Sequence, residues 1–547
     1  MCIRDRNDVW DKCHVIVENT YETPYQEHAF IEPECALAKP GDGGEVIVIG
    51  SMQCPFYART AVARVLGLPM SKVRIIQAAV GGAFGGKEDV PSEVCARAAL
   101  LSQKTGRPVL YARDRKESMV SHTKRHPFII RSKLGADKEG RLLALDIEAI
   151  SDQGAYASVG PFVLYRSTVH AHGSYDIPHA RVDTKLVYTN NVLTGAFRGF
   201  GQPQVAFAME SQMEELAKRL DMDPLELRQK NLAGPGSVSP VGHVFVESDA
   251  NALAQVVEVA LNDSGWKKKK AEYAELNKKG GRYRYGIGAG VISYGVSLGR
   301  EAPDTATSVV QITEDASVSI AHGGTEMGQG SYTTLAMIAS QEMGVPLKHM
   351  HIIPTDTAFI QNSGPSVASR VTPVIGESVR LAAAEAQKAL FKALAKELGC
   401  PETDFSMNTD EGEAWVVSKH EKMTFMEAVH LAYHQGACLQ GVGHKKVFFD
   451  KDTQQQYFTF SSGAHVAEVK VDVETGQVEV LRITAVNDVG KAINPLGLEG
   501  QIEGGVTQGL GLAIMEEVIC KEGRMLNPDF RDYIIPVSYT HLTLPTN

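Results

Sequence analysis

The chain contains the stretch Gly323-Gly324-Thr325-Glu326-Met327-Gly328-Gln329-Gly330, which leads directly into an expected helix over 331–344. A helix start offers unpaired N–H groups and a partial positive charge, and glycine lets a ligand approach the main chain closely. Three more glycine-rich or hydroxyl-rich segments are expected to lead into helices: 80–88, 364–372 and 503–509. Together they indicate a large anionic cofactor held by main-chain groups and by neutral side chains such as Gln329 and Gln508.

Strand-like and helix-like patterns alternate through the chain, which predicts an α+β fold. Short β-rich runs, which predict strands, occur at 45–49, 72–76, 109–112, 128–134, 142–150, 308–312, 317–321, 350–354, 464–473 and 477–485. Helices are expected at 91–103, 212–220, 331–344 and 376–399. Two strand pairs have short connections, so we expect one hairpin over 308–321 and another over 464–485.

The length of 547 residues predicts more than one domain. A stretch rich in glycine, proline and serine at 233–242 has the composition of a linker. We expect three parts in the body of the chain: a first domain over 13–235, a linker and connecting segment over 236–284, and a second domain over 285–536. Residues 1–12 and 537–547 share no pattern with this body and are expected to be anomalous tails, with each domain truncated at its outer end.

Composition argues against several classes of protein. The net charge of -10 gives no basic surface for nucleic acid, and no apolar run approaches the ~20 residues of a membrane span. The first ten residues are polar and do not resemble a signal peptide. Eight cysteines are scattered without a C-x-x-C pair, which is typical of a reduced, cytoplasmic protein without an iron–sulfur cluster of its own. His122 and His126 have the spacing of a metal-binding pair but lack a third ligand, a pattern typical of a surface pair.

Four motifs occur in a fixed order: Gly81-Gly82-Ala83-Phe84-Gly85-Gly86-Lys87-Glu88, Ala196-Phe197-Arg198-Gly199-Phe200-Gly201, the loop 323–330, and Thr507-Gln508-Gly509-Leu510-Gly511. This set resembles the signatures of the molybdenum-binding subunit of the xanthine dehydrogenase and aldehyde oxidase family, over about residues 13–536. The resemblance implies two elongated mixed α/β molybdopterin-binding domains with the cofactor at their interface. It also implies hydroxylation of an electron-poor carbon, with water as the oxygen source.

The cofactor implied by the resemblance is molybdenum–molybdopterin, in the cytosine dinucleotide form, with almost no protein ligands to the metal. Gln53, Phe84 and Arg198 match positions beside the molybdenum, where they would contact its oxo group or the pterin without ligating the metal. The other matched cofactor-binding positions are Gly85, Gly328, Gln329, Ser366, Ala368, Ser369 and Gln508. Two structural alternatives stay open: Arg198 in an ion pair, and the serines as helix caps.

Glu88, Arg166 and Phe200 match the catalytic and substrate-binding positions of purine-oxidising relatives. A carboxylate can accept a hydrogen bond from a ring N–H, and a guanidinium can stabilise negative charge on a heterocycle oxygen. The structural alternative is that Glu88 and Arg166 pair with each other or with Lys87.

The position of a second ring-clamping residue is open. The family's second phenylalanine falls on Leu298 without a gap, or on Tyr294 with a small gap, so nicotinate-like and other N-heterocycles are credible substrates beside xanthine. The general base of the family, a glutamate, would lie beyond Pro536. The chain as given is therefore expected to be inactive or nearly so.

The expected function is hydroxylation of an aromatic N-heterocycle such as xanthine or hypoxanthine, within purine catabolism. Nicotinate-type and aldehyde-type oxidation are the alternatives, together with a cofactor-binding fragment or scaffold that has no catalytic activity. The resemblance implies an iron–sulfur subunit and an FAD subunit as partners, in a higher-order oligomer of heterotrimers. Neither of those modules is present in the sequence.

Overall fold

The computed structural model describes residues 9–410, 412–419 and 421–536. The tails predicted at 1–8 and 537–547 lie outside the described residues. The remainder of the first predicted tail is folded: Trp10–Lys12 form a short 3-10 helix, and the ammonium of Lys133 lies 4.5 Å from the ring centre of Trp10. A tail was expected there because a single turn is too short to show a periodic pattern.

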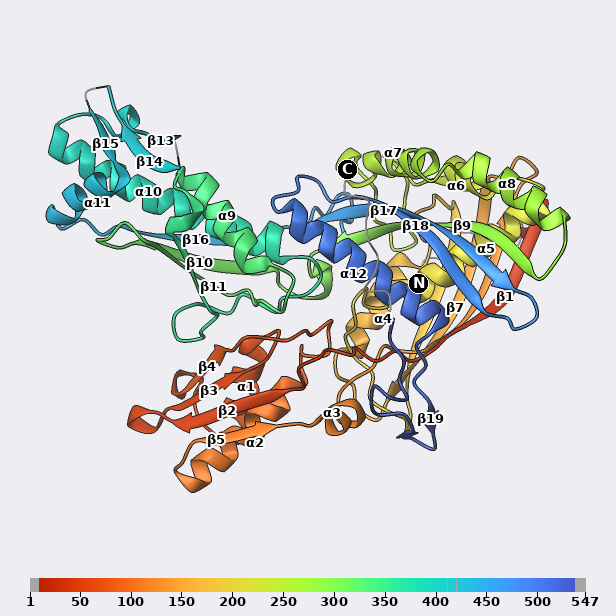
Figure 1. Cartoon of the computed structure of the whole chain (residues 1–547), viewed down its shortest axis with the longest axis horizontal. Coiled ribbons are helices and arrows are strands. Elements are labelled where there is room, and N and C mark those ends of the chain that lie inside the picture. The colour runs from red at the N-terminus through yellow and green to blue at the C-terminus, as the bar shows by residue number, and fades with distance from the viewer. Residues whose placement is uncertain (1–8, 411, 420, 537–547) are drawn as a thin grey trace.

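The first sheet has the strand order β4-β3-β2-β5 (Figure 1). Its strands are β2 (Cys35–Pro40), β3 (Val46–Gly50), β4 (Val73–Gln77) and β5 (Val109–Ala112). Burial alternates along β3 and β4, so one face of each strand enters a core shared with α1 (Pro55–Leu66) and α2 (Pro91–Thr105). Helix α2 begins at Pro91 and ends at Gly106 in the left-handed conformation, as the sequence predicts.

The second sheet has the order β1-β6-β7-β8. It contains β1 (Val15–Thr23), β6 (Phe128–Ala136), β7 (Leu142–Gly154) and β8 (His179–Tyr188), and only the β7–β8 pair is parallel. The accompanying helices are α3 (Arg115–Ser121), α4 (Gly160–His170), α5 (Gln202–Arg219) and α6 (Pro224–Asn231). Helix α5 begins well before the expected start at 212, because it follows directly on the glycine-rich turn around Gly201.

The third sheet has the order β12-β11-β10-β16. It contains β10 (Thr305–Ile312), β11 (Val318–His322), β12 (Met350–Ile353) and β16 (Gln440–Lys446), and it packs against α9 (Ser331–Met343) and α10 (Gly376–Leu398). A peripheral unit of β13 (Ser406–Asp410), β14 (Glu413–Val417), β15 (Lys422–Thr424) and α11 (Phe425–His434) completes this part. The expected β10–β11 hairpin is confirmed.

The fourth sheet joins β9 (Tyr283–Val296), β17 (Thr459–Asp472) and β18 (Val478–Asp488). Its β17–β18 hairpin is also confirmed. The segment 236–284, expected to be a linker and connecting segment, contains α7 (Glu247–Asp263) and α8 (Trp266–Lys278). Leu253, Val256 and Ala260 of α7 have helical spacing and are buried against this sheet, so only the loop before α7 has the conformation of a linker.

Helix α12 (Pro495–Ile514) corrects another expectation. The glycine-rich segment 503–509 lies inside this helix and does not precede its start. The helix begins where the side chain of Asn494 accepts a hydrogen bond from the N–H of Gly497. Two short strands, β19 (Cys520–Lys521) and β20 (Arg524–Met525), follow it. No helix among the described residues is both long and apolar enough to cross a bilayer.

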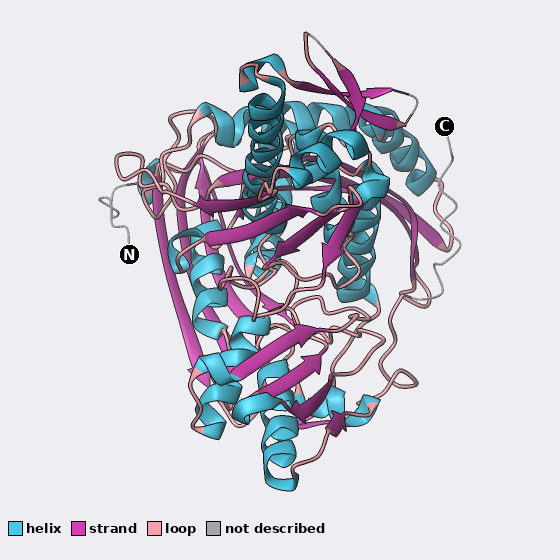
Figure 2. Ribbon diagram, turned by 90° about the vertical axis from the view of Figure 1, so that its left-hand side faces the viewer, coloured by secondary structure: helices cyan, strands magenta, loops and turns pink. Residues whose placement is uncertain are grey.

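The first and third sheets are fastened to each other after β12. The N–H of Gln77 donates to the main-chain oxygen of Thr355 at 2.9 Å, and the N–H of Thr357 donates to the oxygen of Ile75 at 3.0 Å. In Figure 1 these two sheets lie together on the left, and the longer strands lie on the right. Many connecting loops gather in the middle of the molecule in Figure 2. The fold is therefore α+β, with residues up to 235 and residues from 283 on contributing two of these four sheets each.

Candidate functional site

The loop that precedes α2 packs tightly against the loop that precedes α5. The N–H of Arg198 donates to the main-chain oxygen of Phe84 at 2.9 Å. A Cβ on Gly85 would lie 2.7 Å from the oxygen of Ala196, and Gly85 has a φ of 108°, so this position excludes other residues. The N–H of Glu88 donates to the oxygen of Gly85 at 3.2 Å, and the Glu88 side chain is buried. Phe84, Gly85, Glu88 and Arg198 therefore lie together at the contact between these two loops.

Gln53 joins this region to the second half of the chain. Its Oε1 accepts a hydrogen bond from the N–H of Gly85 at 3.0 Å, and its Nε2 donates to the main-chain oxygen of Ser366 at 3.3 Å. The N–H of Gly85 was expected to face the cofactor, but in this structure it is bonded to Gln53. Gly85 serves instead through the close approach that its missing side chain permits.

Ser366 and Gln329 fasten the loops of the second half. The hydroxyl of Ser366 accepts from the N–H of Thr325 at 2.7 Å. The amide of Gln329 donates to the oxygen of Thr325 at 2.8 Å and accepts from the N–H of Met327 at 2.7 Å. Gly328, beside Gln329, has a φ of 105°. These side chains hold the loops that precede α9 and α10 in a fixed relation.

Several predicted residues present main-chain N–H groups that have no protein acceptor in the described part of the chain. They belong to Phe84, Gln329, Ala368 and Ser369. Three of these residues, Phe84, Ala368 and Ser369, have φ values of 53° to 55°, which are costly for residues with a side chain. Such backbone strain gathers at functional sites, and unpaired N–H groups bind anionic and polar ligand edges.

The guanidinium of Arg198 rests on helix α12. It donates to the main-chain oxygen of Gln501 at 2.6 Å and to Oε1 of Gln508 at 3.3 Å. Gly504 of α12 lies against this guanidinium, since a Cβ there would be 3.4 Å from it. Burial lowers the pKa of Arg198. Among the described residues its side-chain partners are neutral oxygens, so the ion-pair alternative is wrong for this part of the chain.

Arg166, on α4, is enclosed by aromatic rings. Its guanidinium donates to the hydroxyl of Tyr294 at 2.9 Å and lies 4.7 Å from the ring centre of Tyr457 and 5.9 Å from that of Phe200. It also donates to the main-chain oxygen of Ser297 at 2.9 Å. Tyr294, one of the two candidates for the second ring-clamping position, therefore lies beside Arg166. Sequence reasoning missed Tyr457, because it comes from a distant loop with no local motif.

Two other charged groups near these residues have their own partners. The ammonium of Lys87 lies 3.0 Å from the carboxylate of Glu32 and 2.9 Å from the hydroxyl of Ser51. His170 accepts a hydrogen bond at Nε2 from the N–H of Gly295 and donates from Nδ1 to the main-chain oxygen of Arg166 at 2.8 Å. Burial and the charge of Arg166 lower the pKa of His170 to about 3. His170 therefore binds the main-chain oxygen of Arg166 as a neutral ring.

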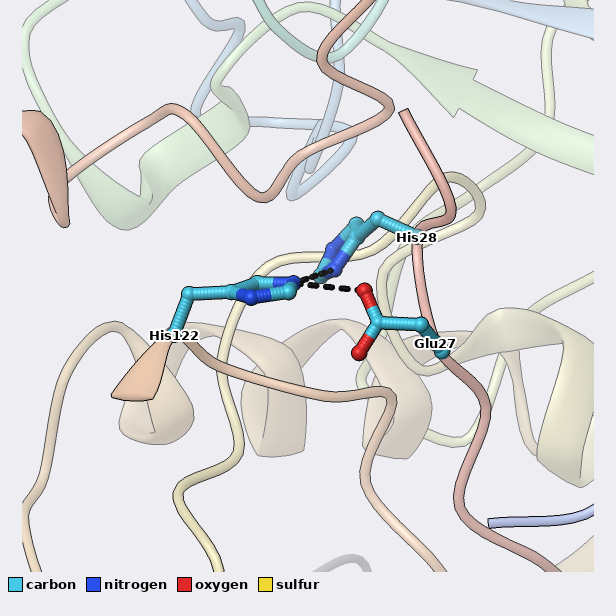
Figure 3. A group of neighbouring side chains, drawn as sticks. All are labelled: Glu27, His28 and His122. Atoms are coloured by element: carbon cyan, nitrogen blue, oxygen red, sulfur yellow. Dashed lines mark hydrogen bonds and ion pairs between the residues drawn. The ribbon is translucent and has the colours of Figure 1, made fainter. Parts of the chain in front are cut away.

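His122 and His126, expected on the surface, are both buried. His122 meets Glu27 and His28 inside the protein (Figure 3). Sequence reasoning missed this cluster because its members come from segments 94 residues apart. Gln26-Glu27-His28 is a polar run between strands, and no helical or strand periodicity marks it as buried.

Two protein families match the chain. Both are described as molybdopterin cofactor-binding domain, and they match residues 3–232 and 259–540. A probable xanthine dehydrogenase subunit from Bacillus subtilis (strain 168) is 34% identical over 526 residues, which are 95% of this chain and 68% of that protein. Xanthine dehydrogenase 1 of Arabidopsis thaliana is 32% identical over 93% of this chain, and the match spans 36% of the plant protein.

Solved structures agree with these sequence matches. Quinoline 2-oxidoreductase from Pseudomonas putida 86 is 25% identical with a TM-score of 0.87, over 98% of this chain and 69% of that one. Aldehyde oxidoreductase from Desulfovibrio gigas is 27% identical with a TM-score of 0.81, over 97% of this chain and 55% of that one. The chain therefore belongs to the xanthine dehydrogenase and aldehyde oxidase family, as a molybdenum-binding subunit with two molybdopterin cofactor-binding domains.

Proposed function

We propose that this chain is the catalytic subunit of a molybdenum hydroxylase that acts on an aromatic N-heterocycle such as xanthine or hypoxanthine, with water as the oxygen source. One observation carries the proposal: the buried guanidinium of Arg166 lies beside Phe200, Tyr294 and Tyr457. A flat, electron-poor ring that carries an oxygen is complementary to such a surface.

The donor groups of the site fit molybdopterin. Unpaired N–H groups of Phe84, Gln329, Ala368 and Ser369 would hold its pterin and phosphate edges, since such groups favour anionic and polar oxygens. Other neutral or cationic donors come from Gln53, Arg198 and Gln508. When bound, this cofactor would supply two-electron oxidation and the activation of water. We propose that the cofactor is the cytosine dinucleotide form of molybdopterin. Gly85, Gly328 and Ser366 would contribute to its binding as parts of the loops that support these donors.

The residues of the chain divide the remaining tasks. Glu88 would accept a hydrogen bond from a ring N–H of the substrate, and Phe200 and Tyr294 would contact the ring. Arg166 would stabilise the negative charge that develops on a ring oxygen during attack. Such a contact typically contributes about 2–4 kcal/mol to transition-state stabilisation in a site that excludes water.

A nicotinate-type reaction is the second candidate, and Tyr294 favours it. The Tyr294 oxygen accepts from Arg166, so its own hydrogen is left to donate. A guanidinium and a phenol side by side suit a substrate carboxylate. An aldehyde-type reaction would make less use of Glu88 and Arg166.

Electrons removed from the substrate must leave the chain. Its eight cysteines form no C-x-x-C pair, so we propose that separate iron–sulfur and FAD subunits receive them. A cytoplasmic, higher-order oligomer of heterotrimers with a role in purine catabolism completes the proposal.

Ligand binding tests the proposal independently of turnover. The full chain from a molybdenum-fed host should contain close to one molybdenum per chain and bind xanthine more tightly than benzaldehyde in calorimetric titrations. Arg166→Met should weaken xanthine binding about 10–100-fold, because a charge-assisted hydrogen bond is lost, and should leave benzaldehyde binding unchanged. Leu298→Ala is the control for the alternative alignment, in which Leu298 would contact the ring, and it should change neither affinity.

The same titrations separate the two candidates. Tyr294→Phe keeps the ring and removes the hydroxyl. If the natural substrate is of the nicotinate type, this change should weaken nicotinate binding more than xanthine binding, because the hydroxyl would bind the carboxylate. Full-length protein without molybdenum would contradict the proposed function as a whole.

A further inference from the structure

A buried cluster of charged side chains lies directly behind the loops that precede α2 and α5. It consists of Glu27, His28, His122 and Lys124, and each of the four is at most 2% exposed. Figure 3 shows the first three. The ammonium of Lys124 lies 2.9 Å from Oε2 of Glu27. Nothing in the proposed reaction uses this cluster, yet burying so many ionisable groups is costly unless each has a partner.

The hydrogen atoms of this cluster follow from its acceptors. Nδ1 of His122 lies 2.6 Å from the main-chain oxygen of Ser118, which can only accept, so Nδ1 carries a hydrogen. Nε2 of His122 lies 2.8 Å from Oε1 of Glu27. Burial raises the pKa of Glu27, but the charges of His122 and Lys124 outweigh it and hold that pKa well below its usual range. The carboxylate of Glu27 therefore faces the ring of His122 with one oxygen and the ammonium of Lys124 with the other.

His28 takes its tautomer from this arrangement. Its Nδ1 lies 3.2 Å from Nε2 of His122. Its Nε2 lies 2.7 Å from the main-chain oxygen of Ala196 and therefore donates to it. Burial and the charge of His122 hold the pKa of His28 well below its usual range, so the ring is neutral.

These assignments argue against a metal ion at the cluster. Glu27, His28 and His122 offer ligand atoms within 4.8 Å of one another. A cation there would have to separate Glu27 from both His122 and the ammonium of Lys124. The ligand atoms of these residues already take part in hydrogen bonds or in the ion pair with Lys124, which is typical of a structural network.

His28 lies between the two loops of the proposed cofactor site. Its ring stacks on Phe197 with 4.4 Å between ring centres. A Cβ on Gly86 would lie 2.9 Å from the same ring. The Ala196 oxygen that His28 holds also lies against Gly85, so the length of this hydrogen bond sets the distance between the loops.

Two further side chains, Arg125 and Gln26, bind the main-chain oxygens of Arg198 and Gln508. Arg125 stacks on Phe197 at 3.9 Å, donates to the main-chain oxygen of Arg198 at 3.0 Å, and donates to Oε1 of Gln26 at 2.8 Å. Gln26 donates in turn to the main-chain oxygen of Gln508 at 3.1 Å. Three carbonyl groups next to proposed cofactor contacts are therefore held by side chains of 26–28 and 122–125.

We propose that His28 is a positioning residue for the cofactor: its Nε2–H, oriented by the charged Glu27–His122–Lys124 group, fixes the Ala196 carbonyl and with it Phe84 and Arg198. This inference rests on the proposed function, because it concerns residues placed toward molybdopterin. Loss of such a supporting contact lowers metal affinity or activity about 10–100-fold in known sites.

The test compares His28→Phe, which keeps a stacking ring without the N–H, with His28→Gln, whose amide nitrogen can take the place of Nε2. His172→Phe is the matched control, since it makes the same change at another buried histidine. Molybdenum per full-length chain should fall at least 10-fold in His28→Phe, and stay within about 3-fold of wild type in the other two variants. The Mo(V) electron paramagnetic resonance spectrum of the residual metal should change only in His28→Phe.

A cofactor-free preparation separates positioning from folding. The three variants should melt within a few degrees of one another when made in a molybdenum-starved host. Unchanged molybdenum content and spectrum in His28→Phe would overturn the inference, as would an equal loss in His28→Gln or a stoichiometric zinc ion that His28→Phe removes. Those results would leave the proposed function intact, whereas wild-type chain without molybdenum would overturn both.

Discussion

Gly85 combines a left-handed backbone, with a φ of 108°, and contact with the Ala196 carbonyl at the position of a Cβ. Gly106 has a φ of 64° and open space around the position of its Cβ. Gly106→Ala should lower the free energy of unfolding by about 1–2 kcal/mol, which is the backbone cost alone. Gly85→Ala should lower it by about 2–5 kcal/mol, because overpacking adds to that cost. Urea denaturation of both variants measures the difference, and equal losses would show that the loops are not in contact.

Single residues also mark the limit of sequence reasoning. The motif residues Gln53, Phe84 and Arg198 contact one another or shared neighbours, because fixed spacing within a motif carries their relation. Tyr457 and His28 have no such motif. Their partners lie far away along the chain, so only the folded arrangement reveals that they support the site.

At the scale of elements, α12 shows how a glycine can serve a neighbouring side chain. Gly504 lies against the Arg198 guanidinium, whereas Gly500 of the same helix has open space around the position of its Cβ. Replacing either with leucine should favour the helix by about 1 kcal/mol. Gly504→Leu should nevertheless displace the guanidinium and lower molybdenum content about 10-fold, while Gly500→Leu should not. Metal analysis and thermal melting of both variants check this. Equal molybdenum content would show that the position of the Arg198 guanidinium against Gly504 does not matter for cofactor binding.

Most strands and helices were predictable, because alternation and helical periodicity are local properties. The two hairpins follow from short connections between strand patterns. The start of α12 was misplaced because glycine usually ends helices, and no local signal reveals that Gly504 makes room for Arg198. Helices α7 and α8 were hidden by the neighbouring linker composition and by the run Lys267-Lys268-Lys269-Lys270.

At the scale of the whole molecule, Arg74 and Asp356 form an ion pair of 2.7 Å that joins the two halves of the chain. A double-mutant cycle with Arg74→Ala and Asp356→Ala should give a coupling energy of about 1 kcal/mol, which falls as salt is added. The exposed pair Lys348 and Glu413 lies within the second half and should show weaker coupling. Denaturation at low and high salt provides the measurement. A coupling energy that does not change with salt concentration would contradict an electrostatic interaction between the two halves.

The amide of Gln53 binds Gly85 on one side and Ser366 on the other. Under the proposed function, a pterin cradle around Gln53 would need both halves of the chain. Capture of the prosthetic group would then be the closing event of maturation, since it would have to wait until both folds have met. Once seated, the group would act as a third component of that contact and make separation of the halves costlier.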